Sequence, residues 1–250
     1  MKSRVLSYLP MVLSLIGTLS ISSCSLFEKD ACAELTCQNG GICNEGICDC
    51  PVGYLGSSCD SFDPTQVQTL LDKGQTPKKL FDGGILLDSL YGKTYKEGLI
   101  FYLNTTDGTG MVAAKTDQSE ASEWGCHRID FEGLNNVQDE PMDSDAETID
   151  GARVGDGMAN TMQIKCDNME GTATDVCRAL GTEWFLPSRA ELYLMYTNLH
   201  VNGYGGFAAD YYWSSTEQNG YTAWAHGFEN GHQAIGSKSI KTYIRAARAF

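Results

Sequence analysis

Residues 32–59 read CAELTCQNGGICNEGICDCPVGYLGSSC, with six cysteines spaced C-x4-C-x5-C-x4-C-x-C-x8-C. A segment this short cannot bury enough apolar surface to stabilise itself, so crosslinks must hold it. Six cysteines can pair in fifteen ways. A zinc cluster is the alternative, but the thiols of an exported chain become oxidised. The stretch therefore predicts a small disulfide-bonded module.

Two segments around these cysteines narrow the choice of module. Residues 38–41, Gln-Asn-Gly-Gly, precede the third cysteine, and residues 50–54, Cys-Pro-Val-Gly-Tyr, begin the last loop. With the cysteine spacing, they resemble the EGF-like module. The resemblance implies disulfide bonds Cys32–Cys43, Cys37–Cys48 and Cys50–Cys59. Closing each loop stabilises the folded module by about 2–4 kcal/mol.

Calcium-binding members of that family carry paired acids before the first cysteine and an aromatic motif before the fifth. Here Lys29-Asp30-Ala31 precedes Cys32, and no aromatic residue lies between Cys43 and Cys48. We therefore expect residues 32–60 to form a module without calcium, acting as a rigid spacer or a protein-contact unit.

The amino terminus has the composition of a secretory signal. A basic start at residues 1–4 and an apolar run over residues 5–21 lead into Ile21-Ser22-Ser23-Cys24. This ending resembles the bacterial lipobox, which implies a signal peptide over residues 1–23, lipid on Cys24, and a tether over residues 24–31. Each buried CH₂ of such a lipid contributes about 0.8 kcal/mol to membrane binding. The alternative is an ordinary signal peptide followed by a structural Cys24.

The residues after Cys24 contain no second apolar run of the roughly 20 residues that a spanning helix needs. Ser25 stands where an Asp would favour retention at an inner membrane. We expect a cell-envelope lipoprotein of a Gram-negative bacterium, anchored to the outer membrane by Cys24 and facing the periplasm or the cell surface.

The charge balance excludes one class of partner. The chain has 18 Lys and Arg against 32 Asp and Glu, a net charge of −14. A surface this acidic repels phosphate backbones, so we expect no nucleic-acid partner.

Residues 61–84 predict a helical lead-in to the main domain, which covers residues 61–250. Asp63-Pro64 and Thr76-Pro77 each read as a helix start, and glycines end both helices at Gly74 and Gly83. Neither segment has the composition of a flexible linker.

The rest of the main domain alternates strand and helix patterns. Helices are expected from Thr174 and from the capping box Ser188-x-x-Glu191. Strands are expected at residues 98–103, 111–114, 211–216, 223–229, 233–237 and 243–250. Helices in the middle and a terminal antiparallel sheet predict an α+β fold.

Six separated motifs bring a second resemblance, and they lie at residues 98–102, 124–126, 184–188, 191–192, 212–216 and 244–250. Together they resemble the Lcl C-terminal domain family, mostly envelope proteins, over about three quarters of the chain. The resemblance implies a C-type-lectin-like fold, with an antiparallel sheet, flanking helices and loops that carry the binding surface.

The namesake of that family is held to bind sulfated glycosaminoglycans, a ligand that fits this chain poorly. Sulfates need a basic patch, and the late cations are few: Lys238, Lys241, Arg245 and Arg248. Arg245 and Arg248 are three apart in an expected strand, so they should face opposite sides.

Three cysteines remain in the main domain, so at least one thiol has no partner within it. Cys166 and Cys177 would close a short loop onto a helix, and we expect that pair to form. Cys126, beside His127, is then the free thiol and behaves as a small buried apolar residue.

Exposed aromatic side chains can stack on sugars or anchor protein interfaces. Most aromatic residues must lie in the core, and of Tyr212 and Trp213 one should face inward because they alternate. The loop at residues 202–210 has three glycines and two aromatic residues. Here we place the ligand-binding residues Tyr204, Phe207, Asp210 and Tyr211.

Metal and catalytic sites find little support. The acidic stretch 139–156 lacks the EF-hand and lectin calcium patterns, so a solvated loop is expected, with calcium as the alternative. His226 and His232 flank a turn, but no motif for a nucleophile, a phosphate loop or zinc is present. We expect no enzyme, metal or cofactor, and an adhesion or ligand-binding protein for carbohydrate or protein. The alternative is a structural envelope protein without a soluble ligand.

Replacing the anchor residue tests the first of these expectations. Cys24→Ala removes the thiol that would carry lipid, so the chain should leave the membrane fraction or persist as an uncleaved precursor. Fractionation with an alkaline wash, followed by intact mass, measures both. Unchanged membrane partition would contradict the lipobox interpretation.

Overall fold

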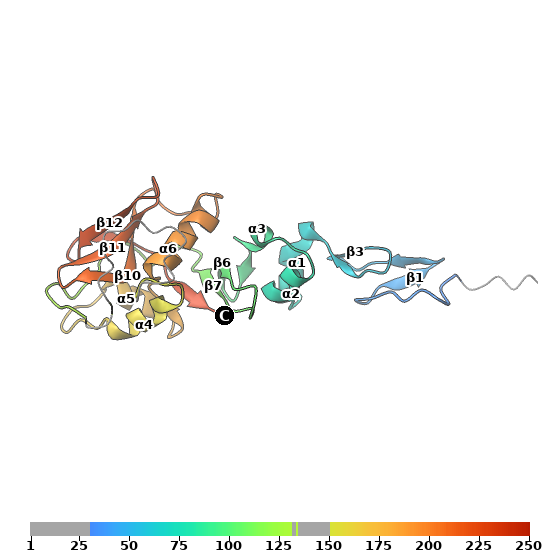
Figure 1. The fold of residues 1–250 in the computed structure, drawn as a ribbon, viewed down its shortest axis with the longest axis horizontal. Coiled ribbons are helices and arrows are strands. Elements are labelled where there is room, and N and C mark those ends of the chain that lie inside the picture. Colours follow the sequence, from blue (N-terminus) through green and yellow to red (C-terminus); the bar gives the residue numbers. More distant parts are fainter. Residues whose placement is uncertain (1–30, 132–133, 135–150) are drawn as a thin grey trace, which may run out of the picture.

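The computed structural model describes residues 31–131, 134 and 151–250. The signal peptide, Cys24 and residues 139–150 of the acidic stretch lie outside these ranges. The described chain is elongated, with the six-cysteine module (residues 32–59) at one end and the main domain at the other (Figure 1). Within the described ranges, no helix has the length and apolar character needed to cross a membrane.

The six-cysteine module is two small hairpins held by disulfide bonds. Its strands are β1 (Ile42–Asn44), β2 (Ile47–Asp49) and β3 (Tyr54–Leu55), and β3 pairs with β4 (Ser61–Phe62), which directly follows the module. The turn between β1 and β2 is Glu45-Gly46, with φ of 51° and 84°, as a two-residue hairpin turn requires. The predicted bonds Cys32–Cys43, Cys37–Cys48 and Cys50–Cys59 are confirmed.

The lead-in after the module is helical, as expected. Its elements are η1 (Pro64–Gln66), α1 (Val67–Asp72), α2 (Pro77–Asp82) and α3 (Leu87–Leu90). Asp63 and Thr76 cap η1 and α2 by accepting hydrogen bonds from the backbone N–H groups of Thr65 and Lys79.

The module docks directly on α1 and the turn that follows it. A Cβ on Gly53 would lie 2.6 Å from Leu70 Cδ2, so this glycine lets the two backbones approach closely. Lys73 Nζ donates to the carbonyl of Val52 at 2.8 Å, and Gln75 Nε2 donates to the Tyr54 hydroxyl at 3.1 Å. These contacts make the module and the lead-in one continuous body.

Two five-stranded sheets form the main domain. The first runs β5 (Thr94–Tyr95), β6 (Gly98–Leu103), β7 (Gly110–Ala113), β14 (Ala247–Ala249), β9 (Trp184–Phe185), all antiparallel. The second runs β12 (Gln233–Ser237), β11 (Thr222–Gly227), β10 (Tyr211–Asn219), β13 (Lys241–Ile244), β8 (Ser119–Glu123). Only β10 and β13 among these described pairs run parallel. Helices and largely antiparallel sheets confirm the mixed α+β class.

The end of the chain corrects one expectation. A single strand was predicted over residues 243–250, but β13 and β14 belong to different sheets. The chain crosses between the sheets at Arg245-Ala246, where both side chains are buried. Strand-forming residues run without a break through this segment, so their pattern does not reveal the crossover.

Three helices cover the sheets: α4 (Asp156–Gln163), α5 (Ala173–Arg178) and α6 (Arg189–Met195), which continues as a π-helix over Tyr196–His200. Ser188 and Glu191 form the predicted capping box. The cap of α5 is Thr172 with Asp175, two residues before the predicted Thr174. Glu191 also accepts a hydrogen bond from the Gly155 N–H at 2.8 Å, which links α6 to the start of α4.

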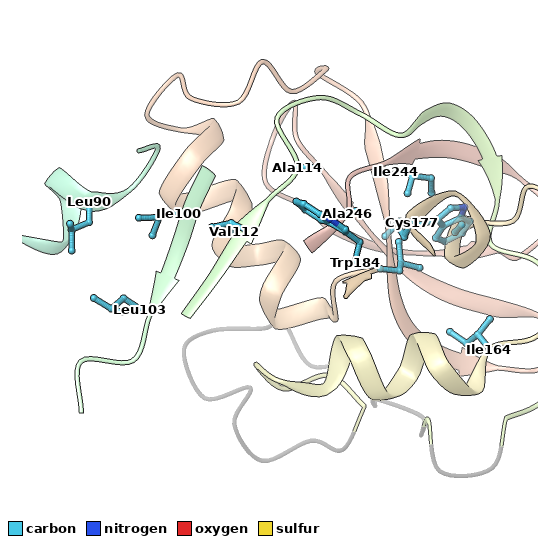
Figure 2. Close-up of a cluster of buried hydrophobic side chains, with 14 of the residues drawn as sticks. Leu90, Ile100, Leu103, Val112, Ala114, Ile164, Cys177, Trp184, Ile244 and Ala246 are labelled. Carbon is cyan, nitrogen blue, oxygen red and sulfur yellow. The ribbon is translucent and has the colours of Figure 1, made fainter. Parts of the chain in front are cut away.

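The core is continuous from the lead-in to the second sheet. Figure 2 shows side chains from Leu90 and Ile100 through Val112 and Trp184 to Ile244 packed in one row. A second cluster includes Phe101, Leu192, Tyr212 and Phe228.

Both Tyr212 and Trp213 are fully buried, whereas only one was expected to face inward. The two residues contribute to different hydrophobic clusters on opposite faces of β10. The expectation assumed a sheet with one solvated face, but this strand is covered on both faces.

One fully buried ion pair joins strand β10 to the residue that follows strand β12. Lys238 and Glu217 are fully buried and pair with each other. Lys238 Nζ also donates to the carbonyl of Ile129 at 2.8 Å and lies 4.5 Å from the Trp124 ring centre. The other carboxylate oxygen of Glu217 accepts the Phe131 N–H at 2.9 Å. A buried charge requires an oppositely charged partner and hydrogen bonds of this kind, because it has lost its contact with water.

The disulfide expected in the main domain is wrong. Cys126 bonds to Cys166, and Cys177 is the cysteine without a disulfide in the described chain. Cys177 points from α5 into the core, beside Ile244 and Ala246 (Figure 2). Cys166 instead lies before α5, close to Gly125, where a Cβ would come within 2.8 Å of its Sγ. Sequence distance favoured Cys177, but the fold brings the Cys126 segment to Cys166.

This pairing predicts the behaviour of the thiols. Burial raises the pKa of the Cys177 thiol, so it should react with a thiol probe only after denaturation. Cys126→Ala should lower the free energy of unfolding by about 2–5 kcal/mol through loss of the bond, and Cys177→Ala should leave that bond intact. Denaturant unfolding and non-reducing peptide mapping measure these effects. A Cys166–Cys177 peptide in the map would contradict the structure.

Candidate ligand-binding surface

The loop at residues 202–210 is held from beneath by Arg245. The Arg245 guanidinium donates to the carbonyls of Gly205 at 2.9 Å and Ala114 at 3.1 Å. Its Nε donates to Asp117 Oδ1 at 2.7 Å, and its Cζ lies 3.9 Å from the Phe207 ring centre. A single buried cation therefore fixes the backbone of the loop.

Asp117 joins the loop to strand β10. Its Oδ2 accepts the Tyr212 hydroxyl at 3.0 Å, and the same hydroxyl accepts the Ala208 N–H at 2.8 Å. Burial and the charge of Asp117 raise the pKa of Tyr212, so this hydroxyl stays protonated and donates. The loop thus has an ordered backbone without secondary structure of its own.

The four predicted ligand residues do not form one surface. Phe207 is half-buried beneath Arg245 and packs against Tyr212 and Phe228, with ring centres 5.7 and 4.8 Å away. It supports the loop and does not present its ring to a ligand. Tyr204 is 41% exposed, and its ring covers Gly92, where a Cβ would lie 2.5 Å from Tyr204 Cγ.

Asp210 and Tyr211 instead lie beside the turn between β11 and β12. The carbonyl of Asp210 accepts the Phe228 N–H at 2.9 Å. Tyr211 is opposite Gly227 in the β10–β11 register and is 37% exposed. A Cβ on Gly227 would lie 3.1 Å from both the Tyr211 ring and Asn230 Oδ1, so ring and amide are neighbours.

We call this region the Tyr211 surface. All five of its side chains are exposed, and they combine one aromatic ring with two carboxylates, an amide and an imidazole. Asn230 Oδ1 accepts the His232 N–H at 3.0 Å, which orders the turn. The members of the surface are Asp210, Tyr211, Glu229, Asn230 and His232.

Sequence reasoning missed three of these residues. Asn230-Gly231 can be recognised as a turn, yet its position beside Tyr211 depends on the pairing of β10 with β11. The register of the β10–β11 hairpin was the signal that could have identified them. Tyr211 pairs with Gly227 at the end of this hairpin, so the residues that follow Gly227 lie beside Tyr211.

His226 lies under this surface and cannot share a metal with His232. It is fully buried, and its ring centre lies 4.8 Å from that of Tyr196 and 5.5 Å from that of Phe228, while His232 is exposed. Burial, with the nearby charges of Arg189 and His200, lowers the pKa of His226 to about 4. In the part of the chain that the structure describes, no three His, Cys, Asp or Glu residues are placed to hold a metal.

Two hollows lie elsewhere on the main domain. One, of about 300 Å³, is lined by Met158, Met162, Lys165 and Trp184 among others. The other, of about 210 Å³, includes Glu123 and Lys241. In the second hollow, the Thr172 hydroxyl donates to Asp175 Oδ2 at 2.7 Å, but this pair is the capping box of α5.

Comparison with known proteins supports the assignment of the small module. The EGF-like domain family matches residues 32–59. A 38-residue segment, 15% of this chain, is 40% identical to the protein glp-1 of Caenorhabditis elegans and spans 3% of that protein. The six-cysteine module is therefore an EGF-like domain with its disulfide bonds, and these two matches concern a small part of the chain.

His226 predicts an acid-sensitive fold. Its pKa falls from 6.5 to about 4 on folding, so the unfolded chain binds one more proton between these pH values. The contribution of His226 to the free energy of unfolding of the wild-type chain therefore decreases as the pH falls from 6.5 to 4, by about 3 kcal/mol at most. His226→Phe should abolish this part of the dependence while keeping the ring packing.

Chemical unfolding at several pH values measures the difference between the two proteins. Burial raises the pKa of Glu191 to about 7, and this residue has the opposite effect on stability. Its contribution to the free energy of unfolding decreases as the pH rises from 4.5 to 7. Because Glu191 is present in both proteins, its contribution cancels in the comparison. Parallel stability curves for wild type and variant would show that His226 does not titrate as stated.

Proposed function

We propose that this chain is a lipid-anchored cell-envelope lipoprotein whose EGF-like module holds a C-type-lectin-like head away from the membrane. The head binds a ligand, with carbohydrate favoured over protein. The carrying observation is the Tyr211 surface: an exposed ring and exposed polar groups lie beside a loop that Arg245 fixes from beneath.

The arrangement of the chain supports a spacer and a head. Contacts of Lys73 with Val52, and of Gln75 with Tyr54, replace a flexible joint between module and main domain. The strands β10–β12 lie at the end of the molecule opposite the module (Figure 1). An anchor at Cys24 would therefore leave the head pointing away from the bilayer.

The lectin-like interpretation is supported by the same six motifs and by the layout of the head. Helices flank sheets that are mostly antiparallel, and the irregular loop 202–210 borders the proposed surface. In such a head the loops carry the ligand and the sheets supply the scaffold.

A sugar suits the chemistry of the Tyr211 surface. Sugar rings present apolar faces that stack on aromatic side chains, and hydroxyl groups that pair with carboxylates and amides. Tyr211 supplies the ring, and Asp210 and Asn230 supply acceptors a few ångströms from it.

A structural envelope protein without a soluble ligand is the second candidate. The observation that favours it is that neither hollow described above includes any residue of the Tyr211 surface.

A glycan array probed with the purified full chain separates the two functions. We expect reproducible binding that Tyr211→Ala weakens by about two- to tenfold, since a stacking contact contributes about 0.5–1.5 kcal/mol. Tyr221→Ala is the matched control, because Tyr221 is 57% exposed and lies in the turn between β10 and β11. Absence of any glycan signal, or equal losses in both variants, would contradict a carbohydrate site at Tyr211.

A further inference from the structure

The segment that builds the Tyr211 surface contains no basic side chain other than histidine. Residues 190–237 include loop 202–210, strands β10, β11 and β12 and the turn at residues 228–232, yet none of them is Lys or Arg. The exposed charged residues of this segment are Asp210 and Glu229, since Glu191 and Glu217 are buried.

Three cations next to this segment, in the sequence or in the fold, have buried side chains. Arg189 is buried with its Cζ 3.5 Å from the Trp224 ring centre. Lys238 is buried against Glu217, and Arg245 is buried against Asp117. None of the three has an exposed charge that could pair with an anionic ligand at the surface.

The exposed charges of this segment would disfavour the binding of an anionic ligand. Sulfate and carboxylate groups on a glycan bind through Lys and Arg side chains, which supply charge and donors together. Within residues 190–237 the exposed charges other than histidine are two carboxylates, and like charges repel across distances shorter than the Debye length. Neutral hydroxyl groups carry no such penalty and can donate to the same carboxylates.

We infer that the Tyr211 surface selects uncharged glycans and rejects sulfated and carboxylated ones. This selectivity rests on the proposed function, because it concerns the same surface. Tyr211 provides the stacking contact, while Asp210 and Glu229 provide discrimination by accepting hydroxyl hydrogen bonds and repelling anions.

The test uses the full chain on an array that carries each core glycan in uncharged, sulfated and sialylated forms. The uncharged form should bind at least tenfold more strongly than its anionic forms at low salt. The ratio should shrink between about 0.01 M and about 1 M salt, as the Debye length falls from about 30 Å to about 3 Å.

Two isosteric changes locate the effect. Asp210→Asn combined with Glu229→Gln removes both carboxylates and should raise the binding of sulfated forms severalfold relative to that of the uncharged form. Asn keeps the oxygen that accepts the Tyr211 N–H. Glu120→Gln, an exposed acid on β8, is the matched control and should change neither.

The outcomes separate this inference from the function beneath it. Binding of no glycan at all would overturn both. Glycan binding that depends on Tyr211 but favours sulfated forms, or is equal for all forms at low salt, would overturn the selectivity and leave the carbohydrate site standing.

Discussion

The buried pair of Arg245 and Asp117 is the interaction on which the head depends. Arg245 sits where the chain crosses from the second sheet to the first, and its hydrogen bonds reach Ala114 and the loop carbonyl of Gly205. Removing one partner of such a pair leaves a buried charge and costs about 3–5 kcal/mol. Because the same cation contacts both the sheet crossover and the loop, the sheet packing and the backbone of loop 202–210 cannot be altered independently.

Local patterns predicted many of the elements but not helix α4 or strands β5, β8 and β9, and tertiary contacts decided what those patterns could not. Strand β6, the Ser188–Glu191 capping box and the EGF-like disulfides follow from residues close in sequence. The Cys126–Cys166 bond joins residues 40 apart and depends on how the sheets bring two loops together. The crossover at Arg245 was missed for a similar reason, since strand propensity continues across it.

The candidate surface divides in the same way. Asp210 and Tyr211 could be chosen from an aromatic, glycine-rich loop, but Phe207 has the same signal and turns inward beneath Arg245. No pattern within the loop distinguishes a ring that supports it from a ring that is exposed. Glu229, Asn230 and His232 join the surface through strand register, which sequence spacing alone does not place beside Tyr211.

Burial removes charges of both signs from the outside of the main domain: the cations Arg189, Lys238 and Arg245, and the acids Glu191 and Glu217. A buried cation balances a negative charge in the sum for the whole chain, but it offers nothing to a ligand at the surface. Arg189, Lys238 and Arg245 are all of this kind: each is buried against rings or a carboxylate. The buried cations of this region pack against rings and carboxylates, and the exposed charges of residues 190–237 other than histidine are acidic.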